Sequence, residues 1–429
     1  MKNPKNTRFY LALVIFSLVG QVAWVVENMY LNVFIYKMFH APASAISAMV
    51  AASAVAATVT TMFIGALSDK LGKRKLFICA GYILWGISIW GFAAVRMDTL
   101  SALVPSTVSA AAVGTSLVII LDCLMTFFGS SANDACFNAW LTDSTNSKNR
   151  GAVEGINAMM PLVAILVVFG GFMSLNQDLP ETWTVIFGVI GTVVTLLGVA
   201  GFFLIDEPRV RTEDNQNYLA NLLYGFRPSI IRANAKLYWT LLAYAVFGVS
   251  INIFMPYLIL YYTVSLGMDN YVLIFAPAIV LAAAFTAFYG RVYDRKGFTA
   301  AVLPALGLLM AGYTVLYFTR DTAPVFIGSL LMMCGYLSGM AVFGAKLRDH
   351  TPKNKSGMFQ GQRIIGQVLL PGVIGPAIGA AVLKNAATVL NSDGTESFIP
   401  NRNIFLAAFV AALVILPGLL PLWDKKTKR

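Results

Sequence analysis

The chain contains a series of apolar runs, each long enough to cross a bilayer and separated by short polar segments. A helix needs about 20 apolar residues to cross the hydrocarbon core, whereas barrel strands have about 10 residues and alternate in polarity. The runs fall near residues 9–36, 44–67, 76–96, 115–141, 152–174, 183–205, 237–263, 270–290, 299–319, 323–345, 362–383 and 403–423. They predict an all-α polytopic membrane protein with twelve transmembrane helices, and both termini on one side.

The composition supports a membrane protein and argues against an enzyme. Hydrophobic residues make up 58% of the chain and charged residues 12%, against about 45–50% and about 25% in soluble domains. The two His and four Cys form no metal-ligand or C-x-x-C spacing, and no nucleotide-binding or hydrolase motif occurs. We therefore expect no metal, no cofactor and no catalysis.

The distribution of Lys and Arg predicts the orientation. Most of these residues fall in the two tails and the even-numbered loops, for example at Lys73, Arg74, Arg209 and Lys425. Cytoplasmic loops carry such an excess, so we expect both termini in the cytoplasm. The net charge of +11 then sets topology and requires no nucleic-acid partner. The first run contains Glu27 and lacks a cleavage site, which is not typical of a signal peptide.

The chain also repeats itself. Residues 65–72 read G-x-L-x-D-K-x-G and residues 290–297 read G-x-V-x-D-R-x-G, and a second pair is Asp143-x-Thr145 and Asp349-x-Thr351. Both pairs lie at equivalent places in six-span blocks. We expect two pseudo-symmetric six-helix bundles: an N-terminal bundle (1–205), a cytoplasmic connector (206–236) and a C-terminal bundle with a short basic tail (237–429).

The repeated loop has a physical interpretation. Glycines permit a tight turn and close helix contact, and an aspartate can cap a helix or pair with a basic residue. The predicted conformational latch consists of Gly65, Asp69, Gly72, Arg74, Asp143, Asp294, Arg295, Gly297 and Asp349. The alternative is that these residues only anchor the topology.

The stretch from Gly65 to Lys75 resembles the loop signature between the second and third helices of the major facilitator superfamily. With a second copy and a 6+6 layout, the resemblance covers the whole chain. It implies two bundles that rock about a substrate site near the bilayer midplane.

Polar residues in the first span mark a candidate site, because polar groups inside a membrane are costly. Gln21, Trp24 and Asn28 follow at i, i+3 and i+7 and share a helix face. Glu27 lies nearer the outside. Burial favours the protonated form of a carboxylate, so Glu27 could carry a proton for coupling. Alternatively, it only hydrogen-bonds within the bundle or near the outer mouth.

The fourth span carries the densest polar group, namely Asn133, Asp134, Phe137, Asn138 and Trp140. Helix rise places Asp134 about 13 Å into the membrane from Asp143. Carboxylate, amide and aromatic groups together suit a polyhydroxylated ligand, and the alternative is a polar clamp between helices. We expect Asp122, farther out on this span, to be an interfacial residue.

This segment resembles the fourth-helix motif of the glycoside–pentoside–hexuronide:cation symporters, the group that contains melibiose permease. Asp134, Phe137 and Ala139 match that motif, Thr145 fits its threonine and Cys136 replaces its proline. The resemblance implies that Asp134 binds sugar.

The second span departs from that family, whose two acids and following proline in the motif D-x3-D-P-x2-G fall here at Ala57, Thr61 and Met62. The sodium site of the family is therefore not expected, and proton coupling through Glu27 or Asp134, or uncoupled transport, is favoured. A distant similarity of residues 20–27 to sucrose:proton symporters agrees with this.

The second half offers fewer polar groups. We predict substrate contacts at Asn252, Tyr257 and Gln367, and a bend or break in the eleventh span between Pro371 and Pro376. Arg363 could extend to the cytoplasmic surface, or reach an acid or an anionic ligand.

Together these features predict a cation-coupled secondary transporter, a symporter for a sugar, glycoside or similar small polar solute. The alternatives are a proton-coupled exporter of drugs or metabolites and a membrane sensor or scaffold without transport. We expect a bacterial cytoplasmic membrane location and a functional monomer whose partners are the solute, the cation and lipid.

Overall fold

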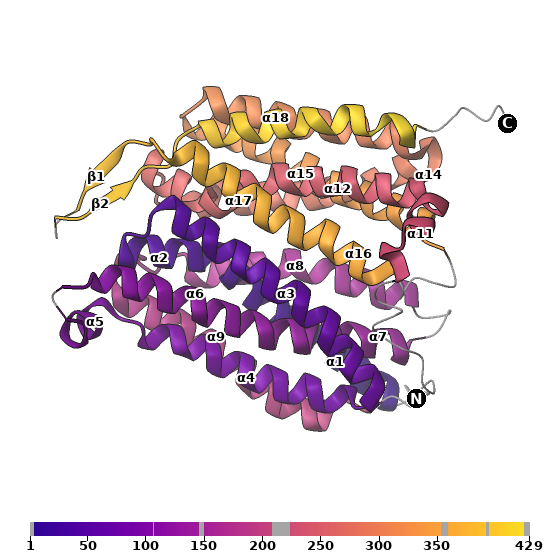
Figure 1. The fold of residues 1–429 in the computed structure, drawn as a ribbon, viewed down its shortest axis with the longest axis horizontal. Coiled ribbons are helices and arrows are strands. Elements are labelled where there is room, and N and C mark those ends of the chain that lie inside the picture. Colours follow the sequence, from indigo (N-terminus) through magenta and orange to yellow (C-terminus); the bar gives the residue numbers. More distant parts are fainter. Residues whose placement is uncertain are drawn as a thin grey trace. The chain divides into compact units, whose positions relative to one another are not determined.

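The structure is a computed structural model that describes residues 4–105, 107–145, 150–207, 224–352, 359–391 and 394–423. The chain divides into two compact units, one formed by Met1–Ala45 with Val55–Gln216 and the other by Ile46–Ala54 with Asn217–Arg429. We call them the first and second unit (Figure 1). Most of the expected connector, residues 208–223, lies outside the described residues.

The first unit is built from long helices, several of which change their winding along their length. Its α-helices are α1 (Pro4–Val25), α2 (Leu31–Phe39), α3 (Ala43–Leu71, apart from Ile46–Ala54, which belong to the second unit), α4 (Arg74–Ala94), α5 (Met97–Leu103), α6 (Ala110–Gly129), α7 (Asn138–Ser144), α8 (Arg150–Phe172) and α9 (Pro180–Leu204). A π-helical turn at Val26–Tyr30 joins α1 to α2, and a second at Ser130–Phe137 joins α6 to α7. Helix α1 packs on α8, and α4 packs on α6 and α9.

The second unit has the same kind of construction. Its α-helices are α11 (Pro228–Ala233), α12 (Ala235–Phe254), α13 (Leu258–Leu260), α14 (Tyr271–Phe318), α15 (Thr322–His350), α16 (Gln360–Ile364), α17 (Leu370–Leu383) and α18 (Asn403–Gly418). Further π-helical turns lie at Tyr261–Ser265 and Ile365–Leu369, and 3₁₀ turns at Tyr224–Phe226, Met255–Tyr257 and Leu420–Leu422. An antiparallel hairpin, β1 (Thr388–Leu390) with β2 (Glu396–Phe398), lies between α17 and α18 and extends beyond their ends (Figure 1).

The helices match the predicted spans. Within the described part of the chain, nine helices are long and apolar enough to cross a membrane. One of them, α14, covers two predicted spans, and the shorter apolar helices Ile156–Phe172 and Asn403–Gly418 correspond to the fifth and twelfth. The expected all-α, twelve-helix membrane architecture is confirmed.

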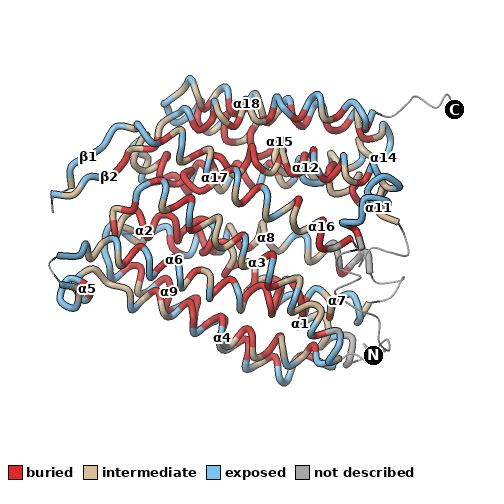
Figure 2. Tube along the Cα trace, in the orientation of Figure 1, coloured by how far each residue is buried: buried red, intermediate tan, exposed pale blue. Residues whose placement is uncertain are grey.

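Helix α9 shows how these helices divide their surface. Its exposed side chains include Val185, Val189, Val193 and Leu196, and its buried ones include Ile186, Ile190, Val194 and Leu197. Both sets recur at intervals of three or four residues, so each forms one face of the helix. Figure 2 shows the alternation of buried and exposed positions along the helix. An exposed apolar stripe of this kind is the surface that lipid covers.

In both copies of the repeated loop, the last glycine has a positive φ. Gly72 ends α3 with φ 62°, and Gly297 breaks α14 with φ 82° and ψ −179°. A positive φ is accessible to glycine and strained for other residues. The sequence repeat therefore has a structural counterpart, and each glycine is required by its backbone.

Candidate functional site

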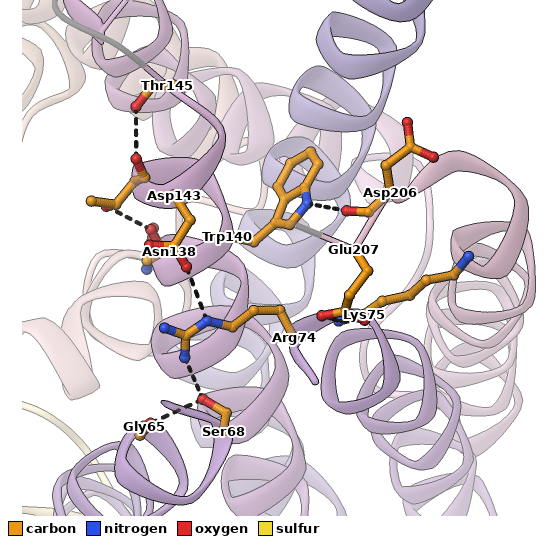
Figure 3. Close-up of polar contacts among 11 residues, drawn as sticks. Gly65, Ser68, Arg74, Lys75, Asn138, Trp140, Asp143, Thr145, Asp206 and Glu207 are labelled. Atoms are coloured by element: carbon orange, nitrogen blue, oxygen red, sulfur yellow. Dashed lines mark hydrogen bonds and ion pairs between the residues drawn. The ribbon is translucent and has the colours of Figure 1, made fainter. Parts of the chain in front are cut away.

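In the first unit, the latch residues form a connected set of polar contacts (Figure 3). Arg74 Nε lies 3.2 Å from Asp143 Oδ2, and Arg74 Nη1 donates to Ser68 Oγ. Ser68 in turn donates to the carbonyl of Gly65 at 2.9 Å. The side chain of Arg74 is 5% exposed and that of Asp143 29% exposed. These contacts fix the loop between α3 and α4 to the end of α7. The side chain of Asp69 lies outside the described residues.

The second unit makes the corresponding contact without an arginine. Tyr293 occupies the place in the repeat that Ser68 occupies in the first copy, and its hydroxyl donates to Asp349 Oδ2. The Asp349 carboxylate corresponds to that of Asp143 in the sequence repeat. Asp294 and Arg295 are exposed. The same two positions of the repeat are thus joined in both units. In the first unit Arg74 links Ser68 to Asp143, and in the second unit the Tyr293 hydroxyl bonds directly to Asp349.

Residues at the start of the expected connector are held by the first unit. Arg8 pairs with Asp206 at 3.2 Å, and Trp140 Nε1 donates to the Asp206 carbonyl at 2.9 Å. The backbone N–H of Lys75 donates to the Glu207 carboxylate at 3.2 and 3.3 Å. Figure 3 shows Asp206 and Glu207 beside the latch. The exit from α9 is therefore fixed to α1, α4 and α7.

The predicted polar group of the fourth span lies in and just after a π-helical turn, a feature often found at functional sites. Asp134 is half-buried, and Ser130 Oγ donates to its Oδ2 at 3.0 Å. Asn138 is exposed and donates from Nδ2 to the Asp134 carbonyl at 3.2 Å. Ser130 thus orients one carboxylate oxygen, and the Asn138 side chain remains accessible. A carboxylate beside an amide can accept and donate hydrogen bonds to hydroxyl groups.

Buried hydrogen bonds from Asn133 and Tyr82 connect this turn to α4 and α1. Asn133 Nδ2 donates to the Tyr82 hydroxyl at 2.6 Å, and Tyr82 donates to the Phe16 carbonyl at 3.0 Å. A methyl group at Gly20 would lie 2.2 Å from Asn133 Nδ2. Helices α1 and α4 and the π-helical turn therefore meet closely here. Asn133 has the placement of a structural residue, in line with the polar-clamp alternative.

Two tryptophans lie near the polar residues of the first span. The rings of Trp24 and Trp85 are 4.9 Å apart between centroids. Trp85 is fully buried and Trp24 is half-buried. Among the described residues, neither indole N–H has a hydrogen-bond acceptor. Buried tryptophan N–H groups usually find a partner, so these two donors are unusual. Gln21 is also half-buried and makes no side-chain hydrogen bond within the described residues.

Glu27 lies in the π-helical turn of the first membrane helix and is 6% exposed. Thr126 Oγ1 donates to Glu27 Oε1 at 2.9 Å. Asp122, one turn from Thr126 on α6, is 1% exposed. The expectation that Asp122 is interfacial is therefore wrong. Helices α2 and α5 also contact α6, near Gly114.

The other predicted contact residues of the first unit, Phe137, Trp140 and Asn28, make contacts within the protein. Phe137 and Trp140 are buried and stack on each other at 5.6 Å between centroids, and Phe137 also packs on Phe16. Asn28 is exposed, and its Nδ2 bonds back to the Trp24 carbonyl at 2.8 Å. In the first unit, Asp134 and Asn138 thus contact each other, Trp24 packs on Trp85, and Glu27 accepts from Thr126. The supporting residues that the sequence did not single out are Ser130, Tyr82, Trp85 and Thr126.

In the second unit the predicted residues are more dispersed. Asn252 Nδ2 bonds to the Gly248 carbonyl at 2.9 Å, and Tyr257 is fully buried with its hydroxyl 3.4 Å from the Pro376 carbonyl. Gln367 lies half-buried in the π-helical turn at Ile365–Leu369. Helix α17 continues from this turn through Pro371 and Pro376 to Leu383, so neither proline breaks the eleventh span. Arg363 is half-buried, and its Nε has no hydrogen-bond partner among the described residues.

Comparison with known proteins identifies the class. A family model of the major facilitator superfamily matches residues 10–376. The chain therefore belongs to the major facilitator superfamily, whose transporter fold it shows. No curated protein sequence matches the chain significantly.

Solved structures with the same fold are transporters of several kinds. A D-xylose–proton symporter has a TM-score of 0.71 at 15% identity, covering 98% of each chain. The nucleoside transporter NupG has a TM-score of 0.70 at 12% identity, covering 97% of this chain and 99% of its own. A bacterial homologue of the human lysosomal transporter Spinster has a TM-score of 0.69 at 15% identity, covering 97% of each. At such low identities, the similarity shows the fold alone.

Proposed function

We propose that this protein is a secondary transporter that moves a small polyhydroxylated solute, such as a sugar or glycoside, across the membrane by alternating access. The observation that carries the proposal is the half-buried Asp134 carboxylate, oriented by Ser130 and placed beside the exposed Asn138 amide. Carboxylate and amide groups bind hydroxyls through hydrogen bonds. The indole N–H of Trp24 and the amide of Gln21 add donors without partners within the described residues.

Coupling to a cation is part of the proposal, with a proton favoured over sodium. Glu27 is the coupling residue, because it is a buried carboxylate within the membrane span. Intramembrane carboxylates commonly serve as proton relays. The acids that the resembled sugar symporters carry in their second helix are absent here, which argues against a sodium site. Transport inward, a bacterial cytoplasmic membrane and cytoplasmic termini complete the proposal.

Binding to the purified protein tests the substrate class. Thermal stability would be recorded with monosaccharides, disaccharides, glycosides, hexuronates and nucleosides, for the wild type, Asp134→Asn and the exposed control Asp178→Asn. A ligand that binds the native state stabilises it by an amount that grows with the logarithm of its concentration relative to its dissociation constant, so one sugar should raise the melting temperature of the wild type and the control. It should leave Asp134→Asn unchanged.

Transport into proteoliposomes then separates the alternatives. Uptake of the binding sugar that is accelerated by an inward proton gradient supports symport. Stabilisation by lipophilic cations alone would favour the exporter. Ligand binding without flux would favour a sensor.

A further inference from the structure

A cavity of about 190 Å³ lies at the end of α4 that is remote from Arg74, beside the start of α9. Its lining includes three aromatic and three charged side chains, namely Phe34, Phe92, Trp183, Lys37, Arg96 and Asp178. One water molecule needs about 15 Å³ of such space. The cavity can therefore hold a polar group much larger than a water molecule.

Arg96 brings hydrogen-bond donors to this cavity that the described residues do not use. Its Nη2 lies 3.3 Å from Glu181 Oε1 and 3.5 Å from Asp98 Oδ2. Within the described part of the chain, its Nε and Nη1 have no acceptor. A guanidinium group has five N–H donors in a planar fork that matches phosphate and carboxylate oxygens. Arg96 can therefore keep both ion pairs and still donate to a bound anionic group.

Acidic side chains outnumber basic ones around the cavity. Arg96 pairs with Asp98 and Glu181, and Lys37 pairs with Asp178. The three carboxylate side chains are between 65% and 70% exposed, so they can accept further hydrogen bonds. A group with negative charge alone would add to the excess of acids and be repelled. A zwitterion with one phosphate and one ammonium group suits both the guanidinium donors and the carboxylates.

An apolar groove of about 440 Å³ continues from the cavity along the exposed face of α9. Thr184 lines both spaces, and the groove extends to Val193, about 13 Å farther along the helix by helix rise. Trp90 of the adjacent α4 also lines the groove, and its Nε1 donates to Thr192 Oγ1 at 3.2 Å (Figure 1). Thr184 donates to the Pro180 carbonyl at 3.4 Å. Both threonine hydroxyls are engaged, so the groove presents chiefly methyl groups and an indole ring.

We propose that the first unit binds one phospholipid here, with its phosphate at Arg96, a headgroup ammonium beside the three carboxylates and an acyl chain in the groove. Phosphatidylethanolamine has such a headgroup. The occupant is amphiphilic because the charged cavity adjoins an apolar groove on the face of α9 that lipid covers. None of these residues belongs to the proposed sugar site, so the inference is independent of which solute is transported.

Photolabelling of the full-length protein tests this site. The protein is reconstituted in phosphatidylcholine vesicles with increasing small fractions of phosphatidylethanolamine that carries a diazirine in one acyl chain. After illumination, peptide mass spectrometry compares labelling of residues 184–193 with that of residues 406–414 of α18, which line neither space and include the exposed Leu406, Val410 and Val414. We expect labelling of residues 184–193 to saturate, because a specific site fills. Labelling of α18 should rise in proportion to the probe.

Competition with unlabelled lipids tests the headgroup. Phosphatidylethanolamine should displace the probe from residues 184–193, because its ammonium group donates hydrogen bonds to carboxylates. The host phosphatidylcholine has no N–H in its headgroup and should compete poorly. Phosphatidylglycerol and diacylglycerol, which lack the ammonium group, should leave the labelling in place at the same mole fraction.

Two variants test the two halves of the site. Arg96→Gln should lower the saturable labelling about tenfold, the effect of losing one hydrogen bond between charged groups, whereas the control Arg402→Gln, an exposed arginine over the Tyr317 ring, should not. Val189→Trp fills the groove, leaves the ion pairs in place and serves if Arg96→Gln does not fold. Its matched control is Val199→Trp, because Val199 lies on the same helix with 46% exposure against 47% and lines neither space.

Three results would overturn the proposal. Labelling of residues 184–193 that only follows the probe fraction, as on α18, would mean ordinary contact with bulk lipid. Equal displacement by phosphatidylglycerol or diacylglycerol would remove the headgroup contact. Unchanged labelling in both Arg96→Gln and Val189→Trp would place the lipid elsewhere.

Discussion

Arg74 Nε lies 3.2 Å from Asp143 Oδ2, and the pair joins the start of α4 to the end of α7. Breaking a buried ion pair by removing one partner costs about 3–5 kcal/mol. Asp143 is partly exposed, so water relieves some of that cost. We expect Arg74→Ala to lower the free energy of unfolding by about 2 kcal/mol, measured by titration with sodium dodecyl sulfate in mixed micelles.

The matched control for Arg74 is Arg295, an exposed arginine of the second copy. Arg295→Ala should change the unfolding free energy by less than about 0.5 kcal/mol, as surface substitutions usually do. Equal effects of the two substitutions would mean that the Arg74 contact does not stabilise the first unit.

Gly297 allows a second test, because its φ and ψ of 82° and −179° lie in a region that is essentially restricted to glycine. Gly297→Ala should destabilise the protein by about 1–3 kcal/mol. Gly290→Ala, in the same helix and with no atom within 4 Å of the added methyl group, is the control and should be neutral or stabilising. Thermal melting of the two variants compares them directly, and a tolerated Gly297→Ala would contradict the kinked backbone of α14.

Substitutions of Tyr82 and Asn133 should have coupled effects on the free energy of unfolding. Tyr82→Phe removes the acceptor for Asn133 Nδ2 and the donor to the Phe16 carbonyl. Leaving buried polar groups without partners costs about 1–3 kcal/mol. The double variant Tyr82→Phe with Asn133→Leu should lose less unfolding free energy than the sum of the losses in the two single variants. We expect a coupling energy of about 1 kcal/mol in this double-mutant cycle. Strict additivity would show that the hydrogen bond contributes no coupling.

Ser130 and Ser131 are neighbours with different partners, which makes them a matched pair for the substrate site. Ser130 donates to the Asp134 carboxylate, whereas Ser131 donates to the Phe127 carbonyl. Hydrogen bonds to charged groups contribute about 1.5–3 kcal/mol. Ser130→Ala should therefore weaken binding of the sugar by about tenfold or more, measured by calorimetry, and Ser131→Ala should leave it within twofold or so. A larger loss in Ser131→Ala would place the ligand elsewhere.

The sequence predicted the spans because apolar length is set by the membrane and needs no knowledge of packing. It located their ends less well. Helix α15, for example, continues to His350, past the predicted end near residue 345. The hydropathy of a helix reports its lipid-covered part, while its backbone hydrogen bonds continue into water.

Within the site, contacts between residues of the same helix could be predicted from their spacing in the sequence, whereas contacts between different helices could not. Ser130 lies four residues before Asp134, so helical spacing alone could have suggested their contact. Tyr82 and Trp85 lie on another helix, and the only sequence signal was a polar aromatic inside a span. Asp122 was misplaced for the same reason, because its burial depends on packing between helices, which spacing along one helix does not reveal.

The π-helical turn at Ser130–Phe137 has a mechanical consequence. It places Asp134 within the turn and Asp143 beyond it, on one continuous helix. An α-helix advances by about 100° per residue, so rewinding the turn by one residue would rotate Asp143 by about that angle relative to the helix before the turn. A change of winding near the Asp134 carboxylate would therefore rotate Asp143 away from Arg74. The span formed by α6, the π-helical turn and α7 would in this way couple the proposed sugar site to the Arg74–Asp143 ion pair.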